Sequence, residues 1–286
     1  MSVGCRRQPP RVVDSAVAES TTCHRFEWSD AGRCRFAVSP LQETMSALLV
    51  LSAPSRHCWY LPWLRDIRSA TATIDLGLLR AAVPSNGHGP DFLWPSPTGP
   101  LATIEEDLAQ VQATSPDVVA AELSEHAGRL DPVTVSADLR RALTGDPTEV
   151  RDTLVAQQRL AWQTLVEPLW DRIRGLLDAD ITTRARHLAD GGLEMLFAHL
   201  HRRAMWENGA LRLTGFRRGT VDLRGRGLIL VPTAFGWPNL ESAPPMALLP
   251  HPLRWSIRCS ARRGSGSPLC DHRRWSVSWA PGARTS

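Results

Sequence analysis

The sequence contains no lysine, because all 33 of its basic residues are arginines. We attribute this bias to a GC-rich coding sequence and not to phosphate recognition. The formal net charge of +4 is unevenly distributed: residues 25–243 hold 23 Arg against 26 acidic residues, whereas residues 244–286 hold 7 Arg against one. The central part is therefore mildly acidic, and by itself it lacks the basic surface that DNA binding requires.

Long apolar runs are also missing. No segment approaches the roughly 18 consecutive apolar residues that indicate a membrane-spanning helix, and the N-terminus has arginines but no apolar signal-peptide core. We expect a cytoplasmic protein with no membrane partner. A chain of 286 residues with 43% hydrophobic residues is long enough to bury a substantial core.

The six cysteines, at positions 5, 23, 34, 58, 259 and 270, include no C-x-x-C pair. This spacing favours reduced thiols over a disulfide framework or a zinc site. Catalytic motifs are equally scarce: no glycine-rich phosphate loop is present, and the Gly-Ser-Gly at 264–266 lacks the strand-turn-helix context of a nucleophile. We predict that the protein is not an enzyme, with no catalytic residues and no cofactor.

The clustered histidines and acidic residues also have ordinary structural explanations. His199 and His201 are two residues apart in "AHLHRR", so on a helix they would point roughly 200° apart, and adding His187 is not expected to help. The acids of "IEEDLAQ" and "DADITTR" are expected to be solvated helix faces or helix-start charges. We therefore predict no metal site.

Helix-start signals dominate the central region. Most combine an N-cap residue with a proline or a glutamate or glutamine nearby, whereas Ser136 has the N-cap residue alone. They occur at Ser39-Pro40-Gln42, Thr103 with Glu106, Ser115-Pro116, Ser136 and Asp146-Pro147. The Pro/Gly-rich segment 84–100 should be irregular. The longest helical pattern follows Asp146; Pro168 should kink or divide it, Gly191 and Gly192 should end it, and "LEMLFAHLH" should form one more short helix.

A two-residue period then replaces the helical one. Asn208-Gly209, in "MWENGALRL", predicts a tight β-hairpin, and "TVDLRG" and "GLILVPTAF" supply further strands. The expected fold class is α+β, with a mainly helical body followed by a small antiparallel β-sheet.

Five tryptophans fall within elements that should pack. Their large amphipathic rings suit either a core or a ligand pocket, and we favour the core. If a pocket exists, we expect it near "HCWYLPWLRD" and the long helical pair. The five are Trp59, Trp63, Trp162, Trp170 and Trp206.

Several blocks, in order, carry a family resemblance. They are "RCRFAVSPLQETMSAL", "YLPWLRDIR", "LVEPLWDRIRGLLDADITTRARHLADGGLEMLFAHLHRRAMWENGALRL" and "GRGLILVPTAFGWPN". From about Arg25 to Asn239, the chain resembles the N-terminal region of actinobacterial ArsR-type winged helix-turn-helix transcriptional regulators. The resemblance implies a homodimer, an unidentified small-molecule effector, and DNA binding by a C-terminal winged helix. The cysteine spacing gives no reason to carry over metal sensing.

The two ends lack such a pattern. Residues 244–286 contain 7 Arg, 7 Ser, 6 Pro and 3 Gly but no helix-turn-helix periodicity. Our hypothesis is that a frameshift near residues 243–250 replaced the winged helix; the competing explanation is an Arg/Trp tail that binds nucleic acid by charge and stacking. Residues 1–24 are expected to be a disordered arm or to reflect an upstream start assignment.

These boundaries define an arm at 1–24, a regulatory and dimerisation domain at 25–243, and an irregular tail at 244–286. The sequence thus predicts the regulatory region of a transcriptional regulator whose DNA-binding domain is truncated. The alternative is a stand-alone helical module that binds a protein or a small molecule without contacting DNA.

Overall fold

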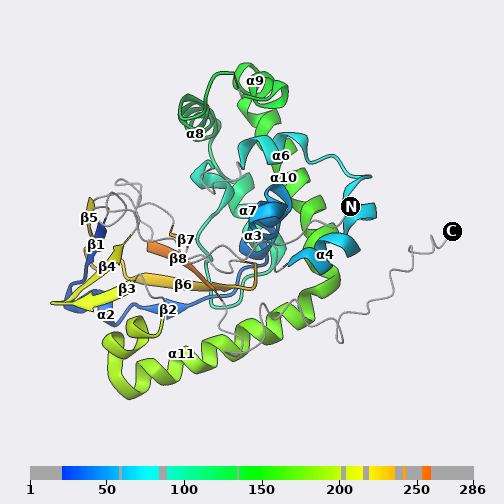
Figure 1. Ribbon diagram of the computed structural model, residues 1–286. Coiled ribbons are helices and arrows are strands. Elements are labelled where there is room, and N and C mark those ends of the chain that lie inside the picture. The colour runs from blue at the N-terminus through cyan, green and yellow to red at the C-terminus, as the bar shows by residue number, and fades with distance from the viewer. Residues whose placement is uncertain are drawn as a thin grey trace.

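A helical body, two small β-sheets and one long helix, α11 (Trp170–Ala198), make up the described structure (Figure 1). The α+β fold class is therefore confirmed. Helix α11 starts beneath the helical body in this view and runs along the lower edge to the sheets. The computed structural model describes residues 21–57, 60–83, 89–133, 135–200, 204–214, 219–235, 241–242 and 253–258.

The helices begin where the N-cap signals predict. The Oγ of Ser39 accepts a hydrogen bond from the Gln42 amide at 2.9 Å, and Thr103 and Glu106 form a reciprocal capping box. The side chain of Gln42 donates to Ser46 instead. The helices of the body are α3 (Pro40–Ser52), α4 (Leu61–Asp66), α5 (Arg68–Thr71), α6 (Gly77–Ala82), α7 (Ile104–Gln112), α8 (Pro116–Gly128), α9 (Ala137–Thr144) and α10 (Pro147–Ala161), and α2 (Trp28–Ala31) lies by the sheets.

Short 3₁₀ turns also occur between the helices of the body. They cover Pro54–Arg56 and Asp91–Leu93. The second of these lies within the Pro/Gly-rich segment 84–100, and the other described residues of that segment belong to no helix or strand. A β-bridge at Leu101 follows the segment. The irregularity expected from its composition is thus largely confirmed in its described part.

Helix α3 forms the centre of the body. Every residue from Pro40 to Val50 is buried, including the acidic Glu43. The carboxylate of Glu43 accepts the amide of Ala234 at 3.0 and 3.1 Å, and the hydroxyl of Tyr60 donates to the carbonyl of Ala234 at 2.8 Å. The body is therefore joined to the end of the central strand of a sheet by buried polar contacts.

The long helical pattern divides at the predicted proline. After α10, a π-helix covers Trp162–Val166 and a 3₁₀ turn covers Glu167–Leu169, and only then does α11 begin. Pro168 has no amide hydrogen for the carbonyl of Thr164, and its ring collides with that carbonyl in a regular α-helix. Widening into a π-helix accommodates both constraints.

The predicted glycine break is also confirmed. Gly191 and Gly192 have non-helical backbone angles, and Gly192 has φ 62° and ψ −157°. The chain reverses there, and the following helical turns place Leu196 and Phe197 in the core beneath the sheets. The segment "LEMLFAHLH" is thus a separate helical piece, although it is continuous with α11 in hydrogen bonding.

The predicted hairpin forms at Asn208 and Gly209, which have φ values of 53° and 71°. It joins β3 to β4 antiparallel, and β4 pairs antiparallel with β1, whereas β1 and β5 are parallel. The first sheet has the order β3-β4-β1-β5. Its strands are β1 (Thr21–Arg25), β3 (Ala204–Glu207), β4 (Ala210–Thr214) and β5 (Gly219–Asp222).

A second sheet has the order β2-β6-β8-β7. Strands β2, β6 and β8 run parallel, and β7 is antiparallel to β8. The expected single antiparallel sheet is thus two mixed sheets. The strands are β2 (Arg35–Phe36), β6 (Leu228–Thr233), β7 (Glu241–Ser242) and β8 (Leu253–Arg258).

Both expected terminal boundaries need correction. Residues 21–24, assigned to an arm, form most of β1, and residues 253–258, assigned to an irregular tail, form β8. Each segment is stabilised by pairing with a strand far away in the sequence, a long-range interaction that local composition does not reveal. The rest of 1–24 and 244–286 lies outside the described residues.

The backbone at Gly192 predicts opposite effects for two Gly→Ala substitutions in one helix. Gly192→Ala forces a side chain into a region essentially restricted to glycine, so it should lower the free energy of unfolding by about 1–3 kcal/mol. Gly175→Ala lies in regular helix with no atom near the new Cβ, so it should raise that free energy by about 0.5–1 kcal/mol. Urea denaturation of both variants checks this, and equal effects would contradict the assigned break.

Buried His24 predicts acid sensitivity of the first sheet. Burial lowers the pKa of His24 from 6.5 to about 4, because the charged imidazole loses its hydration. As the pH falls, the unfolded chain protonates His24 before the folded chain does. The contribution of neutral His24 to the free energy of unfolding is therefore complete above pH 6.5 and is lost as the pH falls to 4. This amounts to about 3 kcal/mol.

The measurement is the free energy of unfolding of the native chain and of His24→Leu from pH 7 to pH 4. The difference between the two chains should change by about that amount over this range. A difference that stays constant with pH would show that His24 is not buried in its neutral form.

Candidate functional site

Two tryptophans lie on either side of the irregular junction between α10 and α11. Trp162 is the first residue of the π-helix, and Trp170 is the first residue of α11. Their ring centroids are 5.1 Å apart with the planes at 72°, an edge-to-face arrangement that aromatic rings favour. Because the π- and 3₁₀-helical residues 162–169 connect the two helices, the relative position of the two rings depends on the geometry of the junction.

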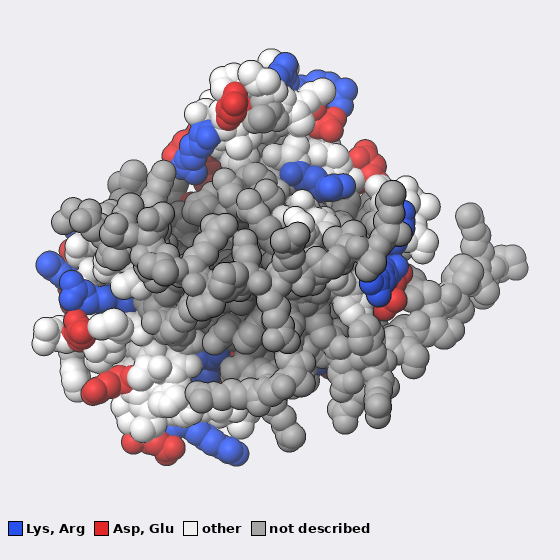
Figure 2. Space-filling view, in the orientation of Figure 1, with Lys and Arg blue, Asp and Glu red and all other residues white. Residues whose placement is uncertain are grey.

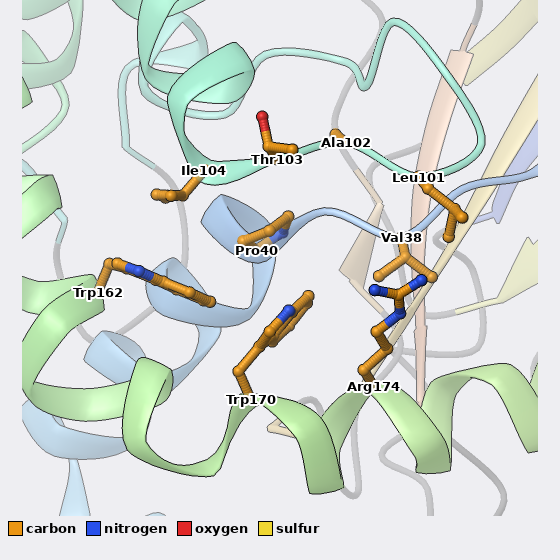
Figure 3. Close-up of a pocket in the computed structure, with 9 residues that line it drawn as sticks. All are labelled: Val38, Pro40, Leu101, Ala102, Thr103, Ile104, Trp162, Trp170 and Arg174. Atoms are coloured by element: carbon orange, nitrogen blue, oxygen red, sulfur yellow. The ribbon is translucent and has the colours of Figure 1, made fainter.

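These rings form one wall of a cavity of about 250 Å³. Figure 3 shows Trp162 and Trp170 facing Pro40 at the start of α3, with the segment before α7 across the top. The complete described lining is Val38, Pro40, Leu101, Ala102, Thr103, Ile104, Trp162, Trp170 and Arg174. Segments from three distant parts of the chain therefore meet at this tryptophan pocket.

Backbone hydrogen bonds fix the wall opposite the tryptophans. Val38 and Leu101 form a parallel β-bridge, in which the Val38 amide donates to the Pro100 carbonyl at 2.9 Å and the Ala102 amide donates to the Val38 carbonyl at 3.1 Å. This ladder holds the two segments side by side at the pocket.

A buried carboxylate anchors the start of α3 behind that wall. Asp107 of α7 accepts the Ser39 hydroxyl at 2.7 Å and the Leu41 amide at 3.2 Å. A negative charge at a helix N-terminus is favourable, because the free amides and the helix dipole both stabilise it. Pro40 is consequently held in place by its own cap and by a second helix.

One cation stands at the edge of the pocket. Arg174 is one turn after Trp170 on α11, and its guanidinium extends toward Val38 and Leu101 (Figure 3). Its side chain is 48% exposed, and its Nε lies 3.9 Å from a carboxylate oxygen of Asp178. Among the described lining residues Arg174 is the charged one, so the pocket combines apolar walls with a positively charged rim.

A second hollow, of about 290 Å³, lies between α6, α9 and α10. Acidic side chains on its lining include Asp75, Asp138, Asp146 and Glu149, and Arg141 pairs with Asp138. It is more open and more polar than the tryptophan pocket, and its groups serve the starts of neighbouring helices, as Asp146 does for α10. The tryptophan pocket is thus the stronger candidate site.

The histidines are arranged differently from the expectation. His187 and His199 come together, with ring centroids 4.4 Å apart, because the chain reverses at Gly191 and Gly192. The Nδ1 of His199 also contacts the Met195 carbonyl at 2.9 Å. His201 lies outside the described residues. The described parts of the chain contain no group of three or more His, Cys, Asp or Glu side chains that could hold a metal ion.

The acids of "IEEDLAQ" divide into surface and buried groups. Glu105 is exposed and pairs with Arg159, whose hydrogen bond lowers the pKa of Glu105. Glu106 completes the Thr103 capping box, and the backbone hydrogen bond from Thr103 lowers its pKa. Asp107, by contrast, is fully buried against α3. A solvated role is thus correct for Glu105, and a helix-start position is correct for all three residues, although Asp107 is buried rather than solvated.

The acids of "DADITTR" show the same division. Asp178 is 53% exposed, as expected, whereas the Asp180 side chain is 1% exposed and forms an ion pair with Arg184 at 2.6 Å. The expectation of a solvated face is therefore wrong for Asp180. Its one-turn spacing to Arg184 leads to a buried pair because this side of α11 faces the protein interior.

The described cysteines, Cys23 and Cys34, are free thiols. Burial raises the pKa of Cys34 to about 12, which keeps it in the unreactive thiol form at neutral pH. No helix in the described part of the chain is long and apolar enough to cross a bilayer.

Of the five tryptophans that were expected to pack, four are described, and their roles differ. Trp63 lies in the core as expected, and Trp206 packs on Phe197 with ring centroids 5.3 Å apart. Trp162 and Trp170 contribute both to the core and to the pocket. Trp59 lies outside the described residues. The interpretation as core residues is thus correct but incomplete.

Sequence reasoning missed Arg174 and the wall at 101–104. The spacing of Trp170 and Arg174, one helical turn apart, places them on one face of a helix and could have indicated a mixed aromatic and cationic site. Nothing local indicates that Leu101 and Val38 lie side by side, because their contact closes a long loop.

Charges on the described surface are mixed. Figure 2 shows Arg and acidic side chains interspersed around the rim of the face that it draws, and the described residues form no basic stripe there. This agrees with the excess of acids over arginines in residues 25–243. On this face the described part of the chain has no surface typical of a DNA-binding element.

Residues 133–243 match a family of unknown function, DUF5937. The match covers α9 to β7 and thus includes both tryptophans of the pocket and Arg174. A search of curated proteins and a search of solved structures each found no match.

Two acids on α11 give a matched test of the burial pattern. Asp180→Asn leaves Arg184 charged and buried without its anion, so it should cost about 3–5 kcal/mol of unfolding free energy. Asp178→Asn removes an exposed partner from Arg174 and should cost below about 0.5 kcal/mol. Thermal and urea denaturation measure both values, and similar costs would show that Asp180 is solvated after all.

Proposed function

We propose that this chain is the effector-binding and dimerising region of a transcriptional regulator of the ArsR-type winged-helix class. The carrying observation is that two blocks on which the resemblance rests supply opposite walls of the tryptophan pocket. "RCRFAVSPLQETMSAL" provides Val38 and Pro40, and "LVEPLWDRIRGLL" provides Trp170 and Arg174. A shared pocket gives a physical reason for both blocks to occur in such a region.

The proposed response begins at the junction between α10 and α11. A ligand between the tryptophans and Pro40 would favour the junction geometry that fits it best, since a ligand shifts a protein toward the state that it binds more tightly. The π-helix and 3₁₀ turn are the segments able to change, because their hydrogen bonding is already irregular.

Helix α11 would carry that change to the sheets. Its final turns place Leu196 and Phe197 against Leu211, Leu213 and Leu228 in the sheet core. A small rotation at Trp170 would therefore be carried about 30 Å along the regular part of α11, up to the break at Gly191 and Gly192, because an α-helix rises about 1.5 Å per residue. In a regulator the sheets would pass this change to the DNA-reading winged helices of a homodimer in the cytoplasm.

The alternative is a stand-alone module that binds a small molecule or a protein without DNA. The acidic balance of residues 25–243 and the mixed charges of Figure 2 favour this reading. The pocket itself is compatible with both functions, so the two proposals differ in what the ligand controls.

DNA binding of the full chain separates the two. We expect the purified chain to bind the DNA upstream of its gene only non-specifically, whereas a version with the reading frame restored after residue 243 should bind a specific site at least about 10³-fold more tightly. Titration at several salt concentrations is required, because non-specific affinity falls steeply with salt.

Two outcomes contradict the proposal. Failure of both chains to bind a specific site, with both folded by circular dichroism, would favour the stand-alone module. Specific binding by the present chain would show that residues 244–286 or the body contact DNA directly. Sedimentation of the present chain should give a dimer, and a monomer at all concentrations would remove the dimerising role.

A further inference from the structure

We infer that the tryptophan pocket binds a small aromatic monocarboxylate, with its ring between Trp162, Trp170 and Pro40 and its carboxylate on Arg174. This deepens the proposed function, on which it rests for its regulatory meaning, by assigning the chemical class of the effector. Three features of the pocket carry the inference: its volume, its aromatic walls and the cation of its described lining, Arg174.

Volume limits the ligand to a single ring. An apolar cavity of about 150 Å³ is large enough to hold benzene. The tryptophan pocket, at about 250 Å³, therefore has room for a benzene ring and a short substituent. Nucleotides, fused polycyclic molecules and long acyl chains are too large to be enclosed.

The walls suit an aromatic ring. Trp162 and Trp170 already adopt an edge-to-face arrangement at 5.1 Å, which leaves ring edges and faces available to a third ring at similar distances. Pro40, Ile104 and Val38 supply the aliphatic remainder of the lining. Polar atoms are scarce along these walls, so the buried part of the ligand must itself be apolar.

Arg174 determines the charge of the ligand. Its guanidinium lies at the rim on the side of Val38 and Leu101 (Figure 3), one helical turn from the indole of Trp170. A planar guanidinium binds a carboxylate through two parallel hydrogen bonds, and it repels an ammonium group. A ligand whose ring enters the pocket therefore carries its anion where Arg174 is located.

Asp178 competes for the same guanidinium. Its carboxylate is 3.9 Å from the Nε of Arg174, beyond hydrogen-bond distance, and both side chains are about half exposed. This loose pair can open without a large penalty, so Arg174 is available to a ligand. Removing the Asp178 charge should consequently strengthen binding of an anion.

The test is calorimetric titration of the full chain with three probes of one shape. Phenylacetate carries the anion, phenylacetamide is its neutral analogue, and phenethylamine is the cation. We expect phenylacetate to bind with a Kd on the order of 0.1 mM, a value typical of a ligand with about ten heavy atoms. The amide should bind about tenfold more weakly, and the amine should not bind detectably.

Variants on α11 assign the anion contact. Arg174→Gln should weaken phenylacetate about tenfold and leave phenylacetamide unchanged, whereas Asp178→Asn should strengthen phenylacetate two- to threefold. The matched control is Arg186→Gln, which removes an equal charge from the same helix about 18 Å from Arg174 and should change neither ligand. Melting temperatures establish that each variant is folded.

Equal binding of phenylacetate and phenylacetamide, or no effect of Arg174→Gln, would overturn the anion assignment. No binding of any probe by the folded chain would overturn the aromatic ligand itself. Phenylacetate binding without any change in DNA binding of the frame-restored chain would leave this inference standing and contradict the regulatory function. Specific DNA binding by the frame-restored chain, combined with no binding of phenylacetate, would contradict this inference and leave the regulatory function standing.

Discussion

The contact between Glu43, Tyr60 and Ala234 holds the two halves of the fold together. A carboxylate in the fully buried helix α3 accepts the Ala234 amide with both oxygens, and a tyrosine hydroxyl donates to the carbonyl of the same residue. An unpaired carboxylate at this depth would be very costly, so the strand end must lie where it does. Ala234 and Phe235, just after β6, are thereby fixed in the core of the helical body.

With β6 fixed to α3, the pocket acquires one rigid wall and one adaptable wall. The rigid side consists of the start of α3 and the 101–104 segment, held by Asp107, by the Ser39 cap and by the bridge between Val38 and Leu101. The adaptable side is the π-helix and 3₁₀ turn that carry Trp162 and Trp170. A ligand that binds between these walls should change the conformation of the adaptable wall while the rigid wall stays in place. A sensor requires such a ligand-dependent change.

Local features of this fold could be predicted from the sequence, because they depend on neighbouring residues. The N-caps at Ser39, Thr103 and Ser115, the division at Pro168 and the Asn208-Gly209 hairpin each follow from the geometry of a few adjacent residues. The α+β class follows from the change in hydrophobic period at the end of the long helix.

Features that depend on distant contacts could not be predicted. Strands β1 and β2 were not indicated by any local signal in the sequence, and they are stabilised because β4, β5 and β6 pair with them. Asp107 and Asp180 were expected to be solvated or helix-start charges, and only packing decides that both are buried. The pocket forms where residues near 38, 101 and 170 meet. The sequence therefore indicated that its tryptophans were buried or ligand-binding, but it did not indicate which other residues surround them.

Hydrogen–deuterium exchange of the full chain, with and without saturating phenylacetate, tests the central claim most directly. A ligand that changes the junction geometry should slow amide exchange in residues 162–174 and also change exchange along α11 and in β3 and β4, which pack on the helical turns beyond the Gly191-Gly192 break, about 30 Å along the helix from Trp170. Protection confined to the pocket lining would contradict the account, because binding would then occur without any transmission through α11 to the sheets.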